Sequence, residues 1–361
     1  METTRSATGL DDLAEVVDTA AAMKASDIHV DGTTGEVWFE VRKSLVRSPR
    51  PPVDRKAIGR WADALLRDAD HLVEKGHAFA AWESSQTRVR AAFYRAAGTF
   101  SVTFRVLPTT ISTPEDLGLP HGVIDLAERR SGLVLFVGST GSGKSTNITS
   151  LVGRINDTKV KHVILLEDPI EYVHTSKNSR IVQREIGEDA RSYVDGVEAS
   201  LRSAPNVLVL GELLDATTAD AALRAATSGH LVFTTWHASS ASEAITSFVG
   251  QFPETGRDQV RSRLAQSLLA IVVQDLVEDT RGGLVAAREV LIMDRDFGDL
   301  ITSQSTHLIE QKLAKEPTSM TLDQSLLALV RDGRITHEVA LATARHPQHL
   351  TQELNRQGIY R

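Results

Sequence analysis

The 361-residue chain contains no cysteine, only 5% aromatic residues, and no apolar run near the roughly 18 residues of a membrane span. Without cysteine there can be no disulfide, thiolate metal site or thiol nucleophile, which suits a reducing cytosol. The first residues also lack the apolar segment of a secretory signal, so we expect a cytoplasmic protein without a transmembrane segment that reaches a membrane only through partners. The net charge of −7 argues against general nucleic-acid binding.

The most informative motif that is present is a glycine-rich loop that follows the apolar run 133–137. Its residues, with the one that follows, are Gly138, Ser139, Thr140, Gly141, Ser142, Gly143, Lys144, Ser145 and Thr146. Glycines let successive amide N–H groups point at a phosphate. Lys144 supplies a charge for the β and γ phosphates and Ser145 a hydroxyl ligand for Mg²⁺, at the positive end of a helix dipole. This loop predicts binding of ATP with Mg²⁺.

The pattern along the chain predicts two domains. Residues 1–107 have the alternation of a small α+β unit, with helices near 10–23 and 54–68 and strands at 28–30, 37–41, 89–94 and 100–106. Residues 108–120 carry three prolines and no sustained periodicity, which indicates an interdomain linker.

Residues 121–361 are predicted to form an α/β domain. Short apolar strands at 133–137, 163–166, 207–210 and 231–235 alternate with helical stretches at 192–203 and 216–228. This arrangement is typical of a parallel sheet covered on both faces. A hairpin turning at 281–283 and short helices complete the chain, one of them with an amphipathic face within 322–330.

Acidic residues follow two of the predicted strands. Glu167, with Asp168 and Glu171, comes after the strand at 163–166, and Glu212 comes after the strand at 207–210. The carboxyl ends of parallel strands meet at one edge of a sheet, so both positions can face the glycine-rich loop. ATP hydrolysis needs carboxylates there to hold Mg²⁺ and orient the attacking water.

Two further features allow more than one interpretation. His230 and His237 stand at the two ends of the strand at 231–235, where a histidine is either a capped structural residue or a sensor of the γ phosphate. A basic run is either a solvated face or the surface of a nucleic-acid translocase. That run consists of Arg42, Lys43, Arg47, Arg50, Arg55, Lys56 and Arg60.

In their order, the motifs of this chain resemble the PilT-like branch of the hexameric type II and type IV secretion ATPases. They span nearly the whole chain and lie at 25–29, 88–90, 104–108, 117–119, 138–145, 167–174, 183–187, 211–212 and 227–237. The resemblance implies a RecA-like P-loop NTPase domain preceded by a smaller, PAS-like α+β domain.

The resemblance also implies roles for individual residues. Glu212 would position the attacking water, Glu167 would assist it, Ser145 would ligate Mg²⁺, and His230 would monitor the γ phosphate. Arg90 and Arg105 would be donated to the phosphates by the first domain of a neighbouring subunit, which makes hydrolysis depend on a ring.

What the resemblance implies at the level of function is a hexameric motor that converts ATP hydrolysis into domain motion about the 108–120 linker. It would power the retraction of a type IV pilus or a related secretion machine, peripheral to the inner membrane. Its expected partners are an inner-membrane platform protein and a paralogous ATPase, with no direct contact to nucleic acid.

The chain departs from the family pattern at several positions. Leu214 stands where an arginine is expected, Asn206 where an acid precedes the strand, and Gly98 at or beside another arginine position. The segment 296–303 does not reproduce the basic-acidic motif of retraction motors. These departures keep an alternative open: a nucleotide-binding, weakly hydrolysing interaction subunit that works with an active paralogous motor.

Overall fold

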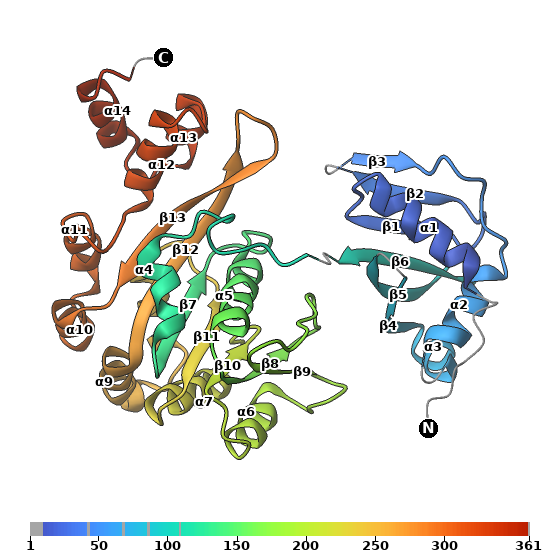
Figure 1. Cartoon of the computed structure of the whole chain (residues 1–361), viewed down its shortest axis with the longest axis horizontal. Helices are drawn as coiled ribbons and strands as arrows, with labels where there is room; N and C mark the ends of the chain where they lie inside the picture. The colour runs from blue at the N-terminus through green and yellow to red at the C-terminus, as the bar shows by residue number, and fades with distance from the viewer. Residues whose placement is uncertain (1–9, 42–43, 67–68, 85–86, 108–109, 360–361) are drawn as a thin grey trace. The chain divides into compact units, whose positions relative to one another are not determined.

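The computed structural model describes residues 10–41, 44–66, 69–84, 87–107 and 110–359. The chain forms two compact units, Met1–Thr110 and Ile111–Arg361, each with its own core (Figure 1). The boundary between the two units, at Thr110 and Ile111, lies within the predicted linker 108–120. No helix in the described ranges is both long and apolar enough to cross a membrane.

The N-terminal unit is built on an antiparallel sheet with the strand order β3-β2-β1-β6-β5-β4 in the described residues. Its elements are α1 (Asp11–Ala22), β1 (Asp27–Val30), β2 (Val37–Val41), β3 (Ser44–Arg47), α2 (Ala57–Leu65), α3 (Ala69–Lys75), β4 (His77–Glu83), β5 (Arg88–Ala96) and β6 (Thr99–Leu107). Alternate residues of β2 and β5 are buried because the described helices of this unit pack on one face of the sheet. Leu13 and Val17 of α1 and Trp61 of α2 fill this core.

Gly98 has a local structural reason. It follows Ala97 in the two-residue turn between β5 and β6, and both residues have positive φ, 80° and 48°. Such a turn matches the twist of the paired strands and favours glycine. The departure at Gly98 is therefore explained by the hairpin between β5 and β6.

Three arginines of the basic run pair with neighbouring carboxylates. Arg47 pairs with Glu36, and Arg50 pairs with Glu15. Arg60 contacts Asp12 and Asp54 at 2.8 and 3.0 Å. Arg42 and Lys43 lie outside the described residues. These pairs favour the solvated face over a nucleic-acid surface.

Asp54, within the predicted second helix, lies before α2, which begins at Ala57.

The second unit contains a mixed sheet with the strand order β13-β12-β7-β11-β10-β8-β9 in the described part of the chain. Strands β12 through β9 are parallel to their neighbours, and only β13 runs antiparallel to β12. The strands are β7 (Gly132–Val137), β8 (His162–Glu167), β9 (Arg180–Glu185), β10 (Val207–Leu210), β11 (Leu231–Trp236), β12 (Leu268–Glu278) and β13 (Leu284–Ile292).

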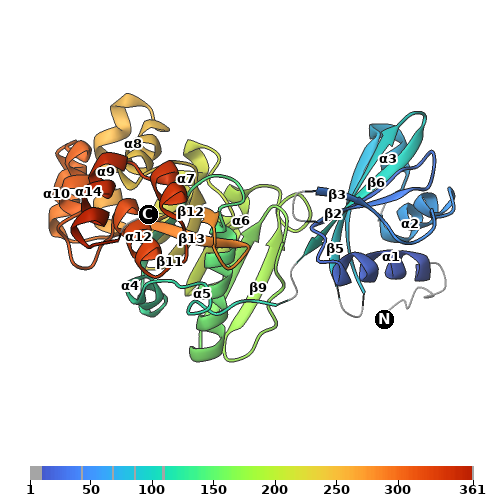
Figure 2. The same cartoon turned by 90° about the horizontal axis from the view of Figure 1, so that it is seen from above.

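Helices cover both faces of this sheet (Figure 2). They are α4 (His121–Ile124), α5 (Lys144–Thr158), α6 (Tyr193–Leu201), α7 (Ala216–Thr227), α8 (Ala241–Gly250), α9 (Arg257–Ser267), α10 (Arg295–Thr302), α11 (Ile309–Leu313), α12 (Leu322–Arg331), α13 (His337–Thr343) and α14 (Pro347–Arg356). Short 3₁₀ helices occur at Asp125–Glu128, Glu254–Gly256 and Thr306–Leu308. The interior strand β7 is fully buried, as the apolar run 133–137 predicted.

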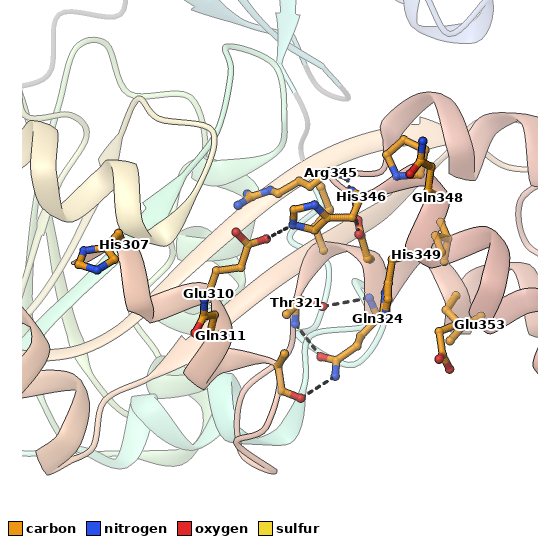
Figure 3. Close-up of a pocket in the computed structure, with 16 residues that line it drawn as sticks. His307, Glu310, Gln311, Thr321, Gln324, Arg345, His346, Gln348, His349 and Glu353 are labelled. Carbon is orange, nitrogen blue, oxygen red and sulfur yellow. Dashed lines mark hydrogen bonds and ion pairs between the residues drawn. The ribbon is translucent and has the colours of Figure 1, made fainter. Parts of the chain in front are cut away.

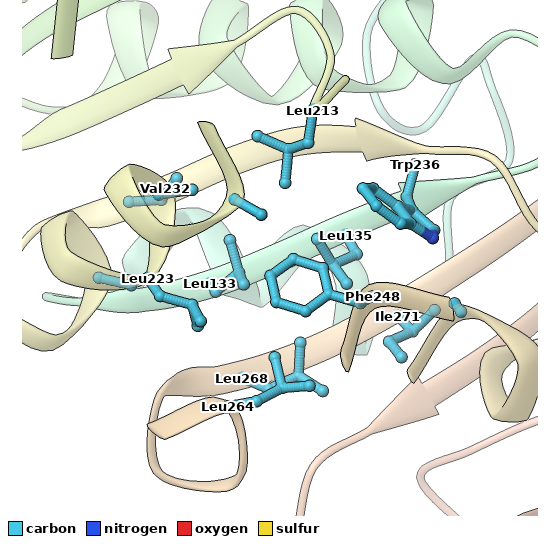
Figure 4. Close-up of a cluster of buried hydrophobic side chains, with 14 of the residues drawn as sticks. Leu133, Leu135, Leu213, Leu223, Val232, Trp236, Phe248, Leu264, Leu268 and Ile271 are labelled. Atoms are coloured by element: carbon cyan, nitrogen blue, oxygen red, sulfur yellow. The ribbon is translucent and has the colours of Figure 1, made fainter. Parts of the chain in front are cut away.

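Successive residues of β7 serve opposite faces of the sheet. Leu133 and Leu135 pack with Phe248 and Trp236 under α7 and α8 (Figure 4). Val134 and Phe136 pack on the other face, against α4 and α5. The strand is therefore fixed from both sides, and so is the loop that follows it. A smaller cluster, with Leu322 and Leu326 of α12, holds the C-terminal helices.

Replacing Phe104 tests the N-terminal core. Its ring is fully buried and meets Trp61 and Phe93 edge to face at 5.8 and 6.4 Å between centroids. Phe104→Ala should lower the free energy of unfolding of this unit by about 3–5 kcal/mol. Urea titration followed by tryptophan fluorescence measures the loss. Phe79→Ala, at a ring that is 59% exposed, is the control and should cost less than about 1 kcal/mol; equal losses would contradict the prediction.

Candidate nucleotide-binding site

The glycine-rich loop connects the end of β7 to the start of α5, as the sequence predicted. Gly138, Gly141 and Gly143 have φ values of 145°, 78° and 88°, a region that favours glycine. A Cβ on Gly138 would lie 2.5 Å from the carbonyl oxygen of Gln274, and one on Gly143 would lie 2.7 Å from Gln274 Nε2. Two of the three glycines are thus required by one neighbouring residue on β12.

Lys144 is folded back onto the loop. Its ammonium donates to the carbonyl oxygens of Gly138 and Ser139 at 2.9 and 2.7 Å, and the residue is 8% exposed. Burial lowers the pKa of Lys144, while the nearby charge of Glu212 acts in the opposite direction. Ser145 is exposed at the first turn of α5, and Thr146 Oγ1 lies 3.3 Å from the hydroxyl of Tyr172.

The two predicted acidic positions lie at the same edge of the sheet as the loop. Glu167 ends β8, and Glu212 follows β10, its parallel neighbour. Glu167 Oε2 accepts a hydrogen bond from Gln183 Nε2 at 2.9 Å. Glu212 is partly exposed, and its charge acts on both Lys144 and Tyr193. The structure therefore brings the loop and both carboxylates together.

Tyr193 is a site residue that the sequence did not suggest. It opens α6, is 6% exposed, and its hydroxyl would lie 2.9 Å from a Cβ on Gly211, so glycine is needed there. Burial raises the pKa of Tyr193, and the negative charges of Glu212, Asp168 and Glu167 raise it further. The phenol therefore remains a proton donor among carboxylates. A lone tyrosine at a helix start carries no pattern that could have revealed this.

The structure places His230, which the resemblance gave the role of monitoring the γ phosphate, at the start of β11. His230 precedes β11, and its backbone carbonyl accepts from the amide of Gly132, the first residue of β7. Its Nδ1 lies 3.1 Å from both Ser228 Oγ and the Ala225 carbonyl oxygen. Six residues of strand, about 20 Å, separate it from the loop of the same chain. His237, which follows β11, lies at the loop's edge instead, because Trp236 pairs with Val137.

Arg90 and Arg105 lie side by side on the N-terminal sheet. They are direct partners across β5 and β6, with side chains on the face that carries no helix. Arg105 is exposed, and its Nε donates to Asp27 Oδ1 at 3.1 Å. The Arg90 guanidinium sits 5.5 Å from the centre of the Phe79 ring.

The other departures differ in character. Asn206 Oδ1 accepts from the amide of His162 at 2.8 Å, which ties the start of β8 to the turn before β10. Asp215 caps α7 by accepting from the Thr218 amide at 2.7 Å. Leu214, which lies between Glu212 and Asp215, is 62% exposed, and no contact in the structure explains a leucine there.

A separate cavity of about 1090 Å³ lies among the C-terminal helices, lined by residues of α11, α12 and α14 (Figure 3). His346 Nε2 and Glu310 Oε1 are 2.9 Å apart on its wall. Arg345 also lines it and pairs with the buried carboxylate of Glu289 at 2.9 Å. None of the predicted site residues lines this cavity.

The residues of the loop fit a nucleotide triphosphate. A cradle that a Cβ would fill, a buried ammonium that donates to two carbonyl oxygens and an exposed serine hydroxyl form one surface. The described residues include no group of three or more His, Asp or Glu side chains placed to hold a metal ion. A Mg²⁺ ion here would depend on phosphate oxygens together with the Ser145 hydroxyl.

Alanine substitutions at Gly138 and Gly141 compare a position where a Cβ would clash with a position where it would not. Gly138→Ala should weaken Mg-ATP binding more than tenfold, because its Cβ meets a carbonyl oxygen at 2.5 Å. Gly141→Ala, at a φ of 78°, has a backbone strain on the order of 1–2 kcal/mol but no atom within 4 Å of its Cβ, and should bind better than Gly138→Ala. Isothermal titration calorimetry checks the order, and the reverse order would refute this account of the loop.

His174, beside the acidic residues, predicts a pH effect on stability. It is 8% exposed, and burial lowers the pKa of its imidazole to about 4 from 6.5. The unfolded chain takes up the proton first, so stability falls as the pH drops from 6.5 toward 4, by about 2 kcal/mol at pH 5. In His174→Gln, the difference between the free energies of unfolding at pH 7 and pH 5, measured by urea titration, should shrink by that amount. His121→Gln, at an exposed residue, should leave it unchanged; an unchanged difference in both variants would exclude His174 as the source.

Comparisons with known proteins identify the family of this chain. The family described as "Type II/IV secretion system protein" matches residues 5–312. The chain is 32% identical to the type IV pilus retraction ATPase PilT of Pseudomonas aeruginosa, covering 94% of this chain and 99% of the relative. It is 35% identical to a twitching motility protein of Neisseria gonorrhoeae, covering 87% and 85%.

Solved structures show the same relationship. A crystal structure of the pilus retraction motor PilT with bound ADP has a TM-score of 0.88 at 34% identity, over 94% of this chain and 99% of the other. The ATPase DotB of Legionella pneumophila has a TM-score of 0.77 at 26% identity, over 95% and 98%. The chain belongs to the type II/IV secretion system protein family and, within it, to the PilT-like motor ATPases.

Proposed function

We propose that this chain is an ATPase motor of a type IV pilus or a related secretion machine. The observation that carries the proposal is the meeting of Lys144 and Glu212: the phosphate-binding loop and a carboxylate occupy one edge of the sheet, close enough for the charge of Glu212 to act on the ammonium. An ammonium and a carboxylate so arranged can hold the β and γ phosphates and orient water.

Each residue of the site has a role in this proposal. The loop amides and Lys144 bind the phosphates, and Ser145 would hold Mg²⁺, which neutralises the charge that develops on them. Glu212 orients the attacking water, and Glu167 assists it from β8. His237 replaces His230 as the residue at the loop's edge that responds to the γ phosphate.

The motor is proposed to work as a homohexamer. Arg90 and Arg105 form a paired cationic surface on the N-terminal unit, suited to the phosphates of a neighbouring subunit. That unit is proposed to be PAS-like, since its helices cover one face of an antiparallel sheet. Arginines supplied between subunits are worth on the order of 10³ to 10⁵ in rate.

The names of relatives support a role in pilus retraction. They include PilT and the type IV pilus ATPase PilU of Pseudomonas aeruginosa, the latter 37% identical over 83% of this chain. We infer a position at the cytoplasmic face of the inner membrane, on a platform protein, beside a paralogous ATPase. The exposed Leu214 supports the alternative of a weakly hydrolysing subunit that depends on such a paralogue.

Glu212→Gln should lower kcat by about 10² to 10⁴ while Mg-ATP still binds, because the amide keeps the shape of the side chain but cannot accept the proton of water. Phosphate release and calorimetry on the purified protein measure the two quantities. Glu254→Gln, at an exposed carboxylate outside the site, should behave as the wild type.

Lys144→Ala provides the baseline for the same assay. A wild-type rate well above this baseline supports the motor. A wild-type rate that exceeds this baseline only when a candidate paralogue is added supports the weakly hydrolysing subunit. Normal turnover in Glu212→Gln would exclude Glu212 from the chemical step.

A further inference from the structure

We propose that Arg288 is a positioning residue for the phosphate-binding loop, which it holds through Gln274 while also holding the segment 111–120 that opens the second unit. The inference rests on the proposed function, because it takes the loop to be the nucleotide site. Arg288 lies on β13 and Gln274 on its partner β12, where the two residues pair directly. No motif in the sequence pointed to either residue.

Gln274 forms one wall of the loop with both its backbone and its side chain. Its carbonyl oxygen approaches Gly138, and its Nε2 approaches Gly143 and donates to the Ser142 carbonyl oxygen at 2.5 Å. Its Oε1 accepts from Asn147 Nδ2 on α5 at 2.9 Å. The side-chain amide of Gln274 therefore touches the loop and the helix that follows it.

Arg288 determines which way that amide points. Its Nε donates to Gln274 Oε1 at 2.6 Å. A guanidinium has only donors, so it can hydrogen-bond to the oxygen of the Gln274 amide but not to its NH₂ group. The NH₂ group must then face Ser142, where the carbonyl oxygen needs a donor. Without Arg288, rotation of the amide by 180° would put two acceptors face to face at the loop.

The other arm of Arg288 reaches the beginning of the second unit. Its two terminal nitrogens donate to the carbonyl oxygens of Gly118 and Leu117 at 2.8 and 2.7 Å. The same segment also contacts α5 through a pair between Glu115 and Arg154 at 2.9 Å. One side chain thus joins the phosphate-binding loop to the part of the second unit that is nearest in sequence to the N-terminal unit.

The environment of Arg288 is unusual for a charge. The residue is 5% exposed, and its oxygen partners within the described ranges are all uncharged. Burial lowers its pKa to about 10, so it remains a cation at neutral pH. A buried cation without a carboxylate adds positive potential near the phosphates and costs more to keep than a paired one.

Three variants and one control in the full chain test the proposal, with affinity for Mg-ADP, kcat and KM as readouts. Arg288→Met should weaken Mg-ADP at least tenfold and raise KM more than it lowers kcat. Arg288→Lys keeps the charge but not the fork, and should recover only part of the affinity. Arg334→Met removes an arginine that pairs with Asp279 outside the site, and should leave affinity within twofold of the wild type.

Gln274→Glu separates positioning from stability. A carboxylate would pair with Arg288 and still accept from Asn147, so the melting temperature should be unchanged or higher. It cannot donate to Ser142, so Mg-ADP binding should fall at least tenfold. A purely structural role for Arg288 predicts the opposite, with stability and affinity moving together.

Hydrogen exchange tests the connection to the leading segment. In the wild type, Mg-ADP should slow amide exchange in 111–120, and in Arg288→Met this nucleotide-dependent protection should disappear. Wild-type affinity and protection in Arg288→Met would overturn the proposal; if that variant does not fold, Arg288→Lys and Gln274→Glu with wild-type affinity overturn it equally. If the wild type binds no nucleotide, the proposed function fails, and this inference fails with it.

Discussion

The close approach of Gln274 to the phosphate-binding loop is the constraint on which the site depends. Its carbonyl oxygen and side-chain amide occupy the space that a Cβ would need at Gly138 and Gly143. The glycines of this loop thus have two reasons to be glycine: amides that point at phosphate, and a wall that comes within van der Waals distance. The loop is held by a strand neighbouring β7, so its shape belongs to the sheet and not to the loop alone.

Side chains alternate between the two faces of each strand, and this alternation links the phosphate-binding loop to other parts of the second unit. Successive residues of β7 anchor opposite helix layers, and successive residues of β13 serve different connections. Arg288 reaches the loop and the segment 111–120, while Glu289 accepts from the amide of Ala241 at 2.7 Å and pairs with Arg345. Burial raises the pKa of Glu289, and the charge of Arg345 opposes that rise. One edge strand therefore connects the phosphate site, the start of α8 and the C-terminal helices.

Local patterns predicted the fold well. The glycine-rich loop, the apolar run of β7 and the acidic residues after β8 and β10 each carry their information in neighbouring residues, and the family resemblance is confirmed. Strand direction decided the rest: β11 runs parallel to β7, so His237 and not His230 lies at the edge of the sheet where the loop begins. Gln274 and Arg288 both lie more than a hundred residues after the loop, in a hairpin without a motif. They come close to the loop because β12 pairs with β7 and β13 with β12.

Lys144 has a consequence for how a ligand arrives. Its ammonium already satisfies two carbonyl oxygens of its own loop, so an incoming phosphate exchanges partners with a group that is occupied. The net electrostatic attraction gained between the ammonium and the phosphate is smaller than for an ammonium without hydrogen-bond partners. In return, the cradle keeps its form between turnovers, and little conformational entropy is lost at the moment of capture. Departure of a bound phosphate would be assisted in the same way, because the two carbonyl oxygens can again accept from the lysine ammonium.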